Sequence, residues 1–436
     1  MLIDFSFSNF KSFRDEQAFS MQRVQRFVDG EDAYAGISTV AAIYGANASG
    51  KSNLLQAFAY MRGMVVTSYA HGNIDSRLPR APFKLNAAQA EKPTEFFAEF
   101  IAVDGLQYQY WFSYDNANIQ TEELRRFNKI NGKASTRASL LFSREKQEIT
   151  FGPSFRGGRA QVKETIKRRT NALVLSVCAA AGIDVTQPAF DFFANEVRYY
   201  QASEFSVEES RIIHELQTDS DYGRMLSHLV RYADFGIESV KAEQVDMTPA
   251  LEQFKQAFPD TADSEMFKPL FENVIGLQLQ FNHLGEDGTM TLPIDEESLG
   301  TRAALAFFSL ALENLSAPTV AIIDEIDTSL HPTFVKEIVG LYTDPATNPH
   351  HAQLIFTTHD VALINTAPSE ERTIQPDQIW FVEKSKQGAS EIYPATDLGL
   401  RKEENIGKNY LNGVYGAVPK PTFHEAFARI MAKEVA

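Results

Sequence analysis

A short glycine-containing segment carries residue types that together bind phosphate. The run "IYGANASGKSNLLQAF" has the spacing G-x-x-x-x-G-K-S. It follows an apolar stretch that predicts a strand and precedes a segment in which Leu54, Leu55 and Phe58 recur with helical period. Glycines let successive backbone N–H groups turn toward phosphate oxygens, and a helix N-terminus adds partial positive charge. The segment therefore predicts a phosphate-binding loop for ATP with Mg²⁺.

Two side chains of this loop have distinct expected roles. Lys51 would reach the β- and γ-phosphates, and Ser52 would offer its hydroxyl to Mg²⁺. A glycine-rich turn that only caps a helix is the alternative, but the four fixed positions rarely occur together by chance. The residues that we expect to contact the nucleotide are Gly45, Ala46, Asn47, Ala48, Ser49, Gly50, Lys51, Ser52 and Asn53.

An apolar run farther along the chain ends in two carboxylates. In "APTVAIIDEIDTSLHP" the apolar character is continuous from Val320 to Ile323, which is typical of a buried parallel strand. The next two residues would face the crevice where α/β sheets bind ligands. We expect Asp324 to bind Mg²⁺, directly or through water, and Glu325 to act as the base that orients an attacking water.

A histidine ends the next apolar run, "AQLIFTTHD". The imidazole of His359 could hydrogen-bond the γ-phosphate. Alone, a histidine is more often structural and an acidic pair more often caps a turn, but their order behind a phosphate loop favours a joint catalytic function. Lys51 and Asp324 lie 273 positions apart, more than a compact phosphate-loop domain needs, so we expect an insertion between them.

A second helix N-terminus is predicted within "EESLGTRAALAFF". Ser298, Gly300 and Thr301 stand immediately before an amphipathic helix. Their hydroxyl and N–H groups would form a second anion-binding helix N-terminus. Simple helix capping by Ser298 or Thr301 is the alternative.

Composition indicates a folded protein without membrane spans. The 436 residues, 44% of them hydrophobic, suffice for one large or two ordinary domains. The single cysteine, Cys178, lies in an apolar run. We interpret it as a buried small residue of a reducing, cytoplasmic protein rather than as a nucleophile. We find no apolar run of about 18 residues, so no transmembrane helix is expected.

The charge balance bears on nucleic-acid binding. A formal net charge of −16 argues weakly against autonomous, nonspecific binding to nucleic acid. Residues 156–169 are a local exception, because they contain six basic side chains and a single acid, Glu164. Most such runs are solvated helix faces, and binding to nucleic acid or to an acidic partner is the alternative.

The remaining pattern predicts an α/β chain with an antiparallel lobe. Alternating aromatic-rich runs around a "VDG" turn predict antiparallel strands, and residues 160–195 look helical. "EVRYYQ" predicts a strand that ends at Gln201. The pattern from 206 to 275 is helical, and strands return at "LQLQFNHL" and "TMTLPI".

Four motifs, in order, resemble the ABC-type ATPase heads of the SMC, RecF and OLD group: "GANASGKSN", "EESLGT", "IIDEID" with "SLHP", and "FTTHD". The resemblance implies an α/β P-loop NTPase of ABC-ATPase type, with a mixed sheet, an antiparallel β lobe and a helical insertion. It implies an N-terminal half of the head at 1–205, an insertion at 206–275 and a C-terminal half at 276–436.

The same resemblance implies a head-to-head homodimer. Ser298 and Gly300 of one copy would complete the ATP site of the other, with Asp327 and Ser329 in the loop that connects the two sites. "SLG" stands where "SGG" is commoner in transporters, so Ser298 is the firmer of the two contacts. Gln201 would be the glutamine linked to Mg²⁺.

A more extensive resemblance, from "PFKL" and "RRTNALVLSV" to "DQIWFVEK" and "YLNGVYGAVP", is to bacterial AAA-family ATP-binding proteins of the RloA and AbiL type. It implies an ATP-hydrolysing switch that dimerises through nucleotide and controls a separate effector, a nuclease or toxin, in anti-phage defence. The competing hypothesis is a RecF-like DNA-binding ATPase of repair or recombination, with residues 156–169 lining a DNA groove. A transporter subunit is disfavoured by the antiparallel lobe.

Overall fold

The architecture is that of a computed structural model, which describes residues 1–28, 34–70, 77–130, 133–201, 205–233, 236–246, 248, 252, 275–365, 372–400, 404–419 and 422–432. The chain divides into two compact units. Unit 1 comprises Met1–Gln201, Asn314–Asp327 and Val339–Ala436, and unit 2 comprises Ala202–Glu313 and Thr328–Ile338. The domain limits expected after residues 205 and 275 stay a prediction.

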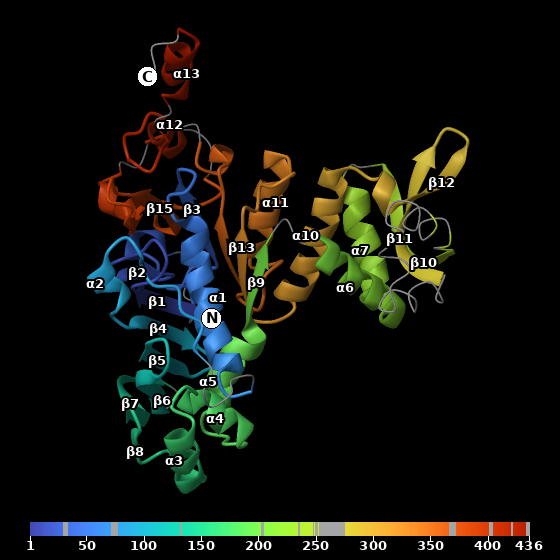
Figure 1. Cartoon of the computed structure of the whole chain (residues 1–436). Coiled ribbons are helices and arrows are strands. Elements are labelled where there is room, and N and C mark those ends of the chain that lie inside the picture. The colour runs from blue at the N-terminus through green and yellow to red at the C-terminus, as the bar shows by residue number, and fades with distance from the viewer. Residues whose placement is uncertain are drawn as a thin grey trace. The chain divides into compact units, whose positions relative to one another are not determined.

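A six-stranded sheet in unit 1 carries most of the predicted motifs. Its order is β16–β15–β3–β14–β13–β9, with every neighbouring pair parallel except β15–β16 (Figure 1). The strands are β3 (Val40–Gly45), β9 (Val197–Gln201), β13 (Val320–Asp324), β14 (Gln353–Thr357), β15 (Ile379–Lys384) and β16 (Ser390–Pro394). Because β3, β14, β13 and β9 are parallel neighbours, their carboxyl ends meet at one edge of the sheet.

The second sheet of unit 1 is antiparallel, with the order β2–β1–β4–β5–β6–β7–β8. The strands are β1 (Leu2–Ser8), β2 (Gln17–Ser20), β4 (Thr94–Ile101), β5 (Gln107–Tyr114), β6 (Ile119–Ile130), β7 (Lys133–Glu145) and β8 (Glu148–Phe151). Side chains alternate between a buried aromatic face and an exposed face, as the period of two in the sequence predicts. This sheet is the expected antiparallel lobe.

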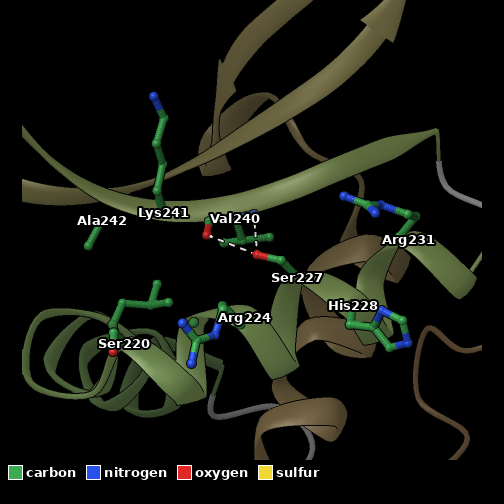
Figure 2. A pocket seen from close by; sticks show the side chains of 10 residues that line it. Ser220, Arg224, Ser227, His228, Arg231, Val240, Lys241 and Ala242 are labelled. Atoms are coloured by element: carbon green, nitrogen blue, oxygen red, sulfur yellow. Dashed lines mark hydrogen bonds between the residues drawn. The ribbon is translucent and has the colours of Figure 1, made fainter.

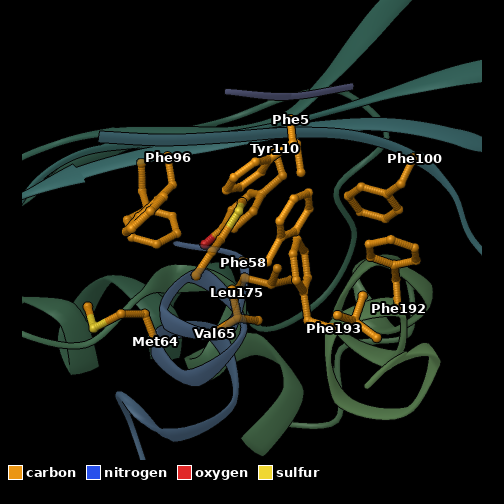
Figure 3. Packing of buried hydrophobic residues seen from close by; sticks show 14 of the residues in the cluster. Phe5, Phe58, Met64, Val65, Phe96, Phe100, Tyr110, Leu175, Phe192 and Phe193 are labelled. Carbon is orange, nitrogen blue, oxygen red and sulfur yellow. The ribbon is translucent and has the colours of Figure 1, made fainter. Parts of the chain in front are cut away.

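Helix α1 (Lys51–Thr67) contacts both sheets of unit 1. Phe58 of α1 stacks on Phe5 of β1 with ring centroids 3.6 Å apart, and Met64 and Val65 continue the packing beneath Phe96 (Figure 3). On its other side α1 contacts β3, β13 and β14. The helix that begins at the phosphate loop is therefore fixed by the main core.

The other helices of unit 1 are short. The α- and π-helices are α2 (Ala87–Ala90), α3 (Arg159–Arg168), α4 (Val174–Ala180), α5 (Gln187–Asp191), the π-helical turn Phe192–Glu196, α12 (Ile406–Leu411) and α13 (Phe423–Met431). Short 3₁₀ helices lie at Gln25–Phe27, Val361–Leu363, Pro376–Gln378 and Ala395–Leu398. The helical prediction for residues 160–195 is confirmed. Cys178 of α4 is fully buried, and burial raises the pKa of its thiol to about 12, which confirms its interpretation as a core residue.

Unit 2 combines helices with a three-stranded antiparallel sheet. It contains α6 (Phe205–Thr218), α7 (Ser220–Tyr232), β10 (Ile237–Asp246), β11 (Ile275–Gly285) and β12 (Gly288–Pro293). Helices α10 (Leu299–Leu315) and α11 (Pro332–Thr343) belong to it for most of their length.

The prediction of a helical pattern from about 206 to 275 is wrong at β10, which lies between two of the expected helices. This strand forms by pairing with β11, in a register that joins Ile237 to His283 and Asp246 to Ile275. Only Ile237 and Val240 of β10 are buried, so its sequence carries too few apolar residues for a strand pattern to stand out. The expected helices "PALEQFKQAF" and "MFKPLFENVIG" lie outside the described residues, except for Glu252.

The predicted α/β class is confirmed, with a mixed sheet, an antiparallel β lobe and a glycine-containing loop between β3 and α1. The ABC-ATPase type stays a prediction. In the described part of the chain, no helix has the length and apolar content to cross a membrane.

Candidate nucleotide-binding site

The phosphate loop joins β3 to α1 and has glycine at two positions that exclude a side chain. A Cβ on Gly45 would lie 2.5 Å from the carbonyl oxygen of Val382 in the neighbouring strand β15. Gly50 has φ = 120°, and a Cβ there would lie 2.7 Å from the hydroxyl of Ser390. The loop curls as a phosphate cradle requires because only glycine tolerates these two positions.

Two serines outside the loop hold it in place. The backbone N–H of Ser390 donates to the carbonyl of Ser12 over 2.8 Å, and the Ser390 hydroxyl contacts the carbonyl of Ser49. Asn53 Nδ2 donates to Ser12 Oγ over 2.8 Å. The Asn53 amide, expected at the nucleotide, thus helps to anchor the loop, whereas Asn47 and Ala48 are exposed.

The ammonium group of Lys51 lies at the centre of the loop. Nζ donates to the carbonyl of Gly45 over 2.9 Å and lies 3.1 Å from Nε2 of His359. Burial lowers the pKa of Lys51, while three nearby carboxylates oppose the shift. Partial burial, followed by the Lys51 charge, lowers the pKa of His359. A neutral imidazole whose Nε2 accepts from the lysine fits both shifts.

The acidic pair is oriented by a residue that the sequence analysis missed. Thr357, the last residue of β14, is fully buried, and its hydroxyl donates to Asp324 Oδ1 over 2.6 Å. The Thr357 hydroxyl oxygen also accepts the backbone N–H of Glu325 over 2.7 Å. In the sequence, Thr357 is the first of the two threonines in "FTTHD", and nothing in that run indicates this role.

The two carboxylates lie in different surroundings. Asp324 is half-buried, while Glu325 is exposed and has φ = 56°, a left-handed conformation that is uncommon for a residue with a side chain. The hydrogen bond from its N–H to Thr357 holds this conformation. Glu325 follows the last residue of β13, and its exposed carboxylate can contact solvent or substrate.

Further contacts tie the loop after β13 to the loop after β14. The backbone N–H of His359 donates to the carboxylate of Asp327 over 3.2 Å, and that of Ile326 donates to the carbonyl of Thr357 over 3.1 Å. Gln201, the last residue of β9, is the register partner of Asp324. Strand order therefore brings Lys51, Asp324 and His359 together and puts Gln201 at the same edge; their roles stay predictions.

The third predicted motif belongs to unit 2. Ser298 is exposed, its hydroxyl accepts the N–H of Thr301 over 3.1 Å, and it also contacts the Thr301 hydroxyl at 2.9 Å. The N-terminus of α10 is thus capped, which was the alternative to anion binding. A Cβ on Gly300 would lie 3.1 Å from the carbonyl of Ser329, so the connecting loop runs close beside this motif.

The basic segment 156–169 is partly occupied by structural contacts. Arg159 donates to the carbonyls of Phe155 and Gly152, each over 3.0 Å, and the Arg169 guanidinium lies 5.2 Å from the ring centroid of Tyr69. Arg168 pairs with Glu164. Three further cations on or beside α3 are exposed, namely Arg156, Lys163 and Lys167, and Nζ of Lys163 lies 5.9 Å from the ring centroid of Phe151.

Unit 2 has a hollow of about 430 Å³ between α7 and β10 (Figure 2). Ser227 of α7 bridges to the backbone of Val240 on β10. Arg224, Arg231 and Lys241 surround the hollow, but each forms an ion pair with a carboxylate, and Lys241 points away from α7 in Figure 2. The basic side chains therefore do not converge on an anion.

Comparison with known families places these motifs in context. Residues 40–365 match the family described as "AAA domain, putative AbiEii toxin, Type IV TA system". The chain belongs to this family. It therefore carries an AAA-type ATPase domain, and the match spans the phosphate loop, the acidic pair and His359. A search of curated proteins finds no match.

Solved structures show a distant likeness. An SMC head bound to the C-terminal winged-helix domain of ScpA has 15% identity and a TM-score of 0.40, covering 90% of this chain and 96% of that one. The recombination mediator protein RecF has 14% identity in two structures. The ATPrS form has a TM-score of 0.35 and covers 90% of this chain and 98% of the RecF chain. The ATP form has a TM-score of 0.34 and covers 90% of this chain and 97% of the RecF chain.

Proposed function

We propose that this protein is an ATP-binding and ATP-hydrolysing switch whose nucleotide state controls a partner effector. The observation that carries the proposal is the convergence of Lys51, Asp324 and His359 at the carboxyl edge of one parallel sheet, with the exposed Glu325 beside them. These are the residue types that phosphoryl transfer to water requires.

The site fits ATP with Mg²⁺. Gly45 and Gly50 let the loop pack closely against Val382 and Ser390, in a curled conformation whose backbone N–H groups suit a polyphosphate. Asp324 is a carboxylate whose orientation is fixed by Thr357. Ser52, Asp324 and Gln201 would hold Mg²⁺, which neutralises phosphate charge when it is bound.

Each side chain then has a defined task. Lys51 compensates the negative charge that develops on the transferred group. Glu325 accepts a hydrogen bond from the attacking water and orients it. The neutral His359 holds the lysine through Nε2, and it can instead hydrogen-bond a phosphate oxygen when the lysine turns to the nucleotide.

A dimer would complete the site. Unit 1 holds the phosphate loop, while Ser298 and Gly300 lie in unit 2 at the capped N-terminus of α10, where Ser298 is exposed. We propose that these residues of one copy meet the γ-phosphate bound by another, and that Asp327 and Ser329 relay this contact between sites. Hydrolysis would then depend on head-to-head pairing.

The effector is proposed to be a separate nuclease or toxin acting in anti-phage defence. The family description, which names a toxin and a type IV TA system, supports a function alongside a toxin. The resemblance of the chain to RloA- and AbiL-type ATPases points the same way. A cytoplasmic location fits such a role.

The alternative is a RecF-like ATPase that binds DNA through residues 156–169. Arg156, Lys163 and Lys167 remain exposed and favour it, whereas the structural contacts of Arg159 and Arg169 and the net charge of −16 weigh against it. The DNA affinity of the double variant Lys163→Glu with Lys167→Glu would distinguish the two functions. A loss of DNA affinity, with a salt slope smaller by about one unit per lost contact, would favour the DNA-binding function.

The switch is tested by ATP-dependent crosslinking. Cysteines replace the exposed Asn47 and Leu299 in a Cys178→Ala background that also carries Glu325→Gln. Glu325→Gln should slow hydrolysis by about 10²- to 10⁴-fold and preserve ATP binding, so that paired heads accumulate and crosslink only with ATP.

Ser298→Arg should abolish this crosslink because a bulky charge replaces the hydroxyl at the interface. The matched control is Ser385→Arg, at another exposed serine whose hydroxyl accepts a backbone N–H. Crosslinking that does not require ATP, or that both arginine variants affect equally, would contradict the dimeric switch.

A further inference from the structure

The exposed face of the antiparallel lobe contains two aromatic side chains in direct register. Phe97 of β4 pairs with Trp111 of β5, and both are only partly covered. The same row continues to Ser6 of β1 on one side and to Glu123 of β6 on the other. These rings lie on the face opposite the aromatic core of Figure 3. Tryptophan is enriched among the residues that dominate binding at protein interfaces, so a tryptophan beside a second ring on this face is a candidate contact site.

A hollow of about 430 Å³ surrounds this pair. Its rim carries the exposed carboxylates of Glu16 and Glu95, together with the hydroxyls of Ser6, Ser8 and Thr121. Among the described residues that line it there is no lysine or arginine. The hollow therefore combines an indole with two exposed carboxylates, and no basic side chain is among its described lining residues.

The acidic character extends beyond the hollow along the same face. Asp4 of β1 and Glu99 of β4 are register partners in the adjacent row of this face. That row continues to Gln109 and Arg125, and Arg125 forms an ion pair with Glu123, so the acidic end of the row is at β1 and β4. Residues Glu95, Phe97 and Glu99 alternate along β4, so neighbouring members of this series lie about 7 Å apart. An extended chain with basic residues at alternate positions has the same repeat.

We propose that this surface, the Phe97–Trp111 surface, docks a basic segment of a partner protein. A lysine or arginine side chain would lie on the Trp111 indole, the aromatic ring that attracts cations most strongly, with its charge beside Glu95 and Glu16. Nucleic acid and anionic lipid are disfavoured because their phosphates would face carboxylates. A small cation would use the hollow but leave the row at Asp4 and Glu99 unused.

The surface is separate from the nucleotide site. No residue of the phosphate loop lines the hollow. Peptide binding and ATP hydrolysis can therefore succeed or fail independently, so loss of one would not be mistaken for loss of the other.

The test uses the full chain and a fluorescein-labelled peptide of about nine residues in which arginine alternates with glycine or serine. In the absence of nucleotide, fluorescence anisotropy measures the affinity of the protein for this peptide. Tryptophan emission gives a second readout, because the chain has two tryptophans and Trp380 is only 6% exposed. Binding should change the emission of Trp111, and a peptide with glutamate in place of arginine should not bind.

Trp111→Ala and the pair Glu16→Lys with Glu95→Lys should each weaken binding by about tenfold, while Trp111→Phe should retain most of it. The matched control is Glu145→Lys with Glu148→Lys, which reverses two exposed carboxylates of the same sheet outside the hollow. This control should leave affinity within about twofold of wild type. Unchanged thermal unfolding would verify that each variant is folded.

Four results would overturn the proposal. They are absence of arginine-peptide binding, an equal loss in the control pair, full affinity in Trp111→Ala, and wild-type self-association that Glu16→Lys with Glu95→Lys abolishes. The last result would assign the surface to a second copy of this chain, whose own basic segment 156–169 would be the occupant.

Discussion

Nζ of Lys51 lies 3.1 Å from Nε2 of His359, so the lysine of the phosphate loop and the histidine after β14 form one hydrogen-bonded pair. The pair exists because β14 lies between β3 and β13 in the sheet. The histidine is thereby close both to the lysine and, through its backbone N–H, to Asp327. We therefore expect a substitution of Lys51, His359 or Asp327 to shift the positions of the other two side chains.

Lys51→Ala should abolish ATP hydrolysis. The lysine supplies the positive charge at the end of the loop, and removal of one such group costs about 10²- to 10³-fold in rate. Steady-state phosphate release measures the effect, and Lys336→Ala, at an exposed lysine of α11, is the control. Wild-type turnover in Lys51→Ala would exclude the loop as the ATP site.

His359→Gln should remove one source of acid sensitivity. The pKa of His359 is lowered in the folded protein, so as the pH falls the unfolded chain takes up this proton first. The contribution of His359 therefore reduces the free energy of unfolding as the pH falls through about 6.5. Thermal unfolding at about pH 7.5 and about pH 5.5 should show a smaller loss of Tm in His359→Gln than in wild type. His424→Gln, at an exposed histidine of α13, should behave as wild type; identical losses in all three proteins would contradict the assignment.

The sequence was sufficient to identify the strand ends of the site but not the contacts between them. Gly50, Asp324 and His359 could be placed because each follows a local apolar run whose spacing is visible in the chain. The role of Thr357 depends on strand order, which is set by pairing between distant segments. Strand β10 was not predicted for the same reason. It forms by pairing with β11, and the sequence between the two strands, residues 247–274, has no strand pattern.

Buried polar groups were the other feature that the sequence concealed. In "EELRRF" the alternation of β6 predicts a strand with polar residues, yet Glu122 points into the core and is fully buried. Its carboxylate accepts the N–H groups of Val174 and Leu175 and the hydroxyl of Tyr110, and it lies 3.7 Å from Arg144. A charge inside an aromatic core can be recognised only when its partners are known.

Glu122→Ala should therefore destabilise the protein by about 3–5 kcal/mol, because it leaves the buried Arg144 and two backbone N–H groups uncompensated. Glu122→Gln, which keeps the shape and one acceptor, should cost less. Urea unfolding gives both values. The control is Glu123→Ala on the opposite face, where the pairing with Arg125 is partly exposed and should contribute within about 1 kcal/mol. Equal costs for Glu122→Ala and Glu123→Ala would show that the buried network does not hold α4 to the lobe.

Thr357→Val should separate catalysis from nucleotide binding. Valine keeps the volume of threonine but removes the hydroxyl that donates to Asp324 and accepts from the N–H of Glu325. ATP hydrolysis should fall by about tenfold or more while ATP affinity changes little, and the Mg²⁺ concentration for half-maximal rate should rise because Asp324 loses its orienting donor. Thr357→Ser should restore both quantities. Thr358→Val is the matched control, since Thr358 is equally buried and its hydroxyl accepts the N–H of Asp360 instead of contacting the acidic pair. If Thr357→Val and Thr358→Val show the same rate and the same Mg²⁺ dependence, the hydroxyl of Thr357 stabilises the fold and does not position the acidic pair.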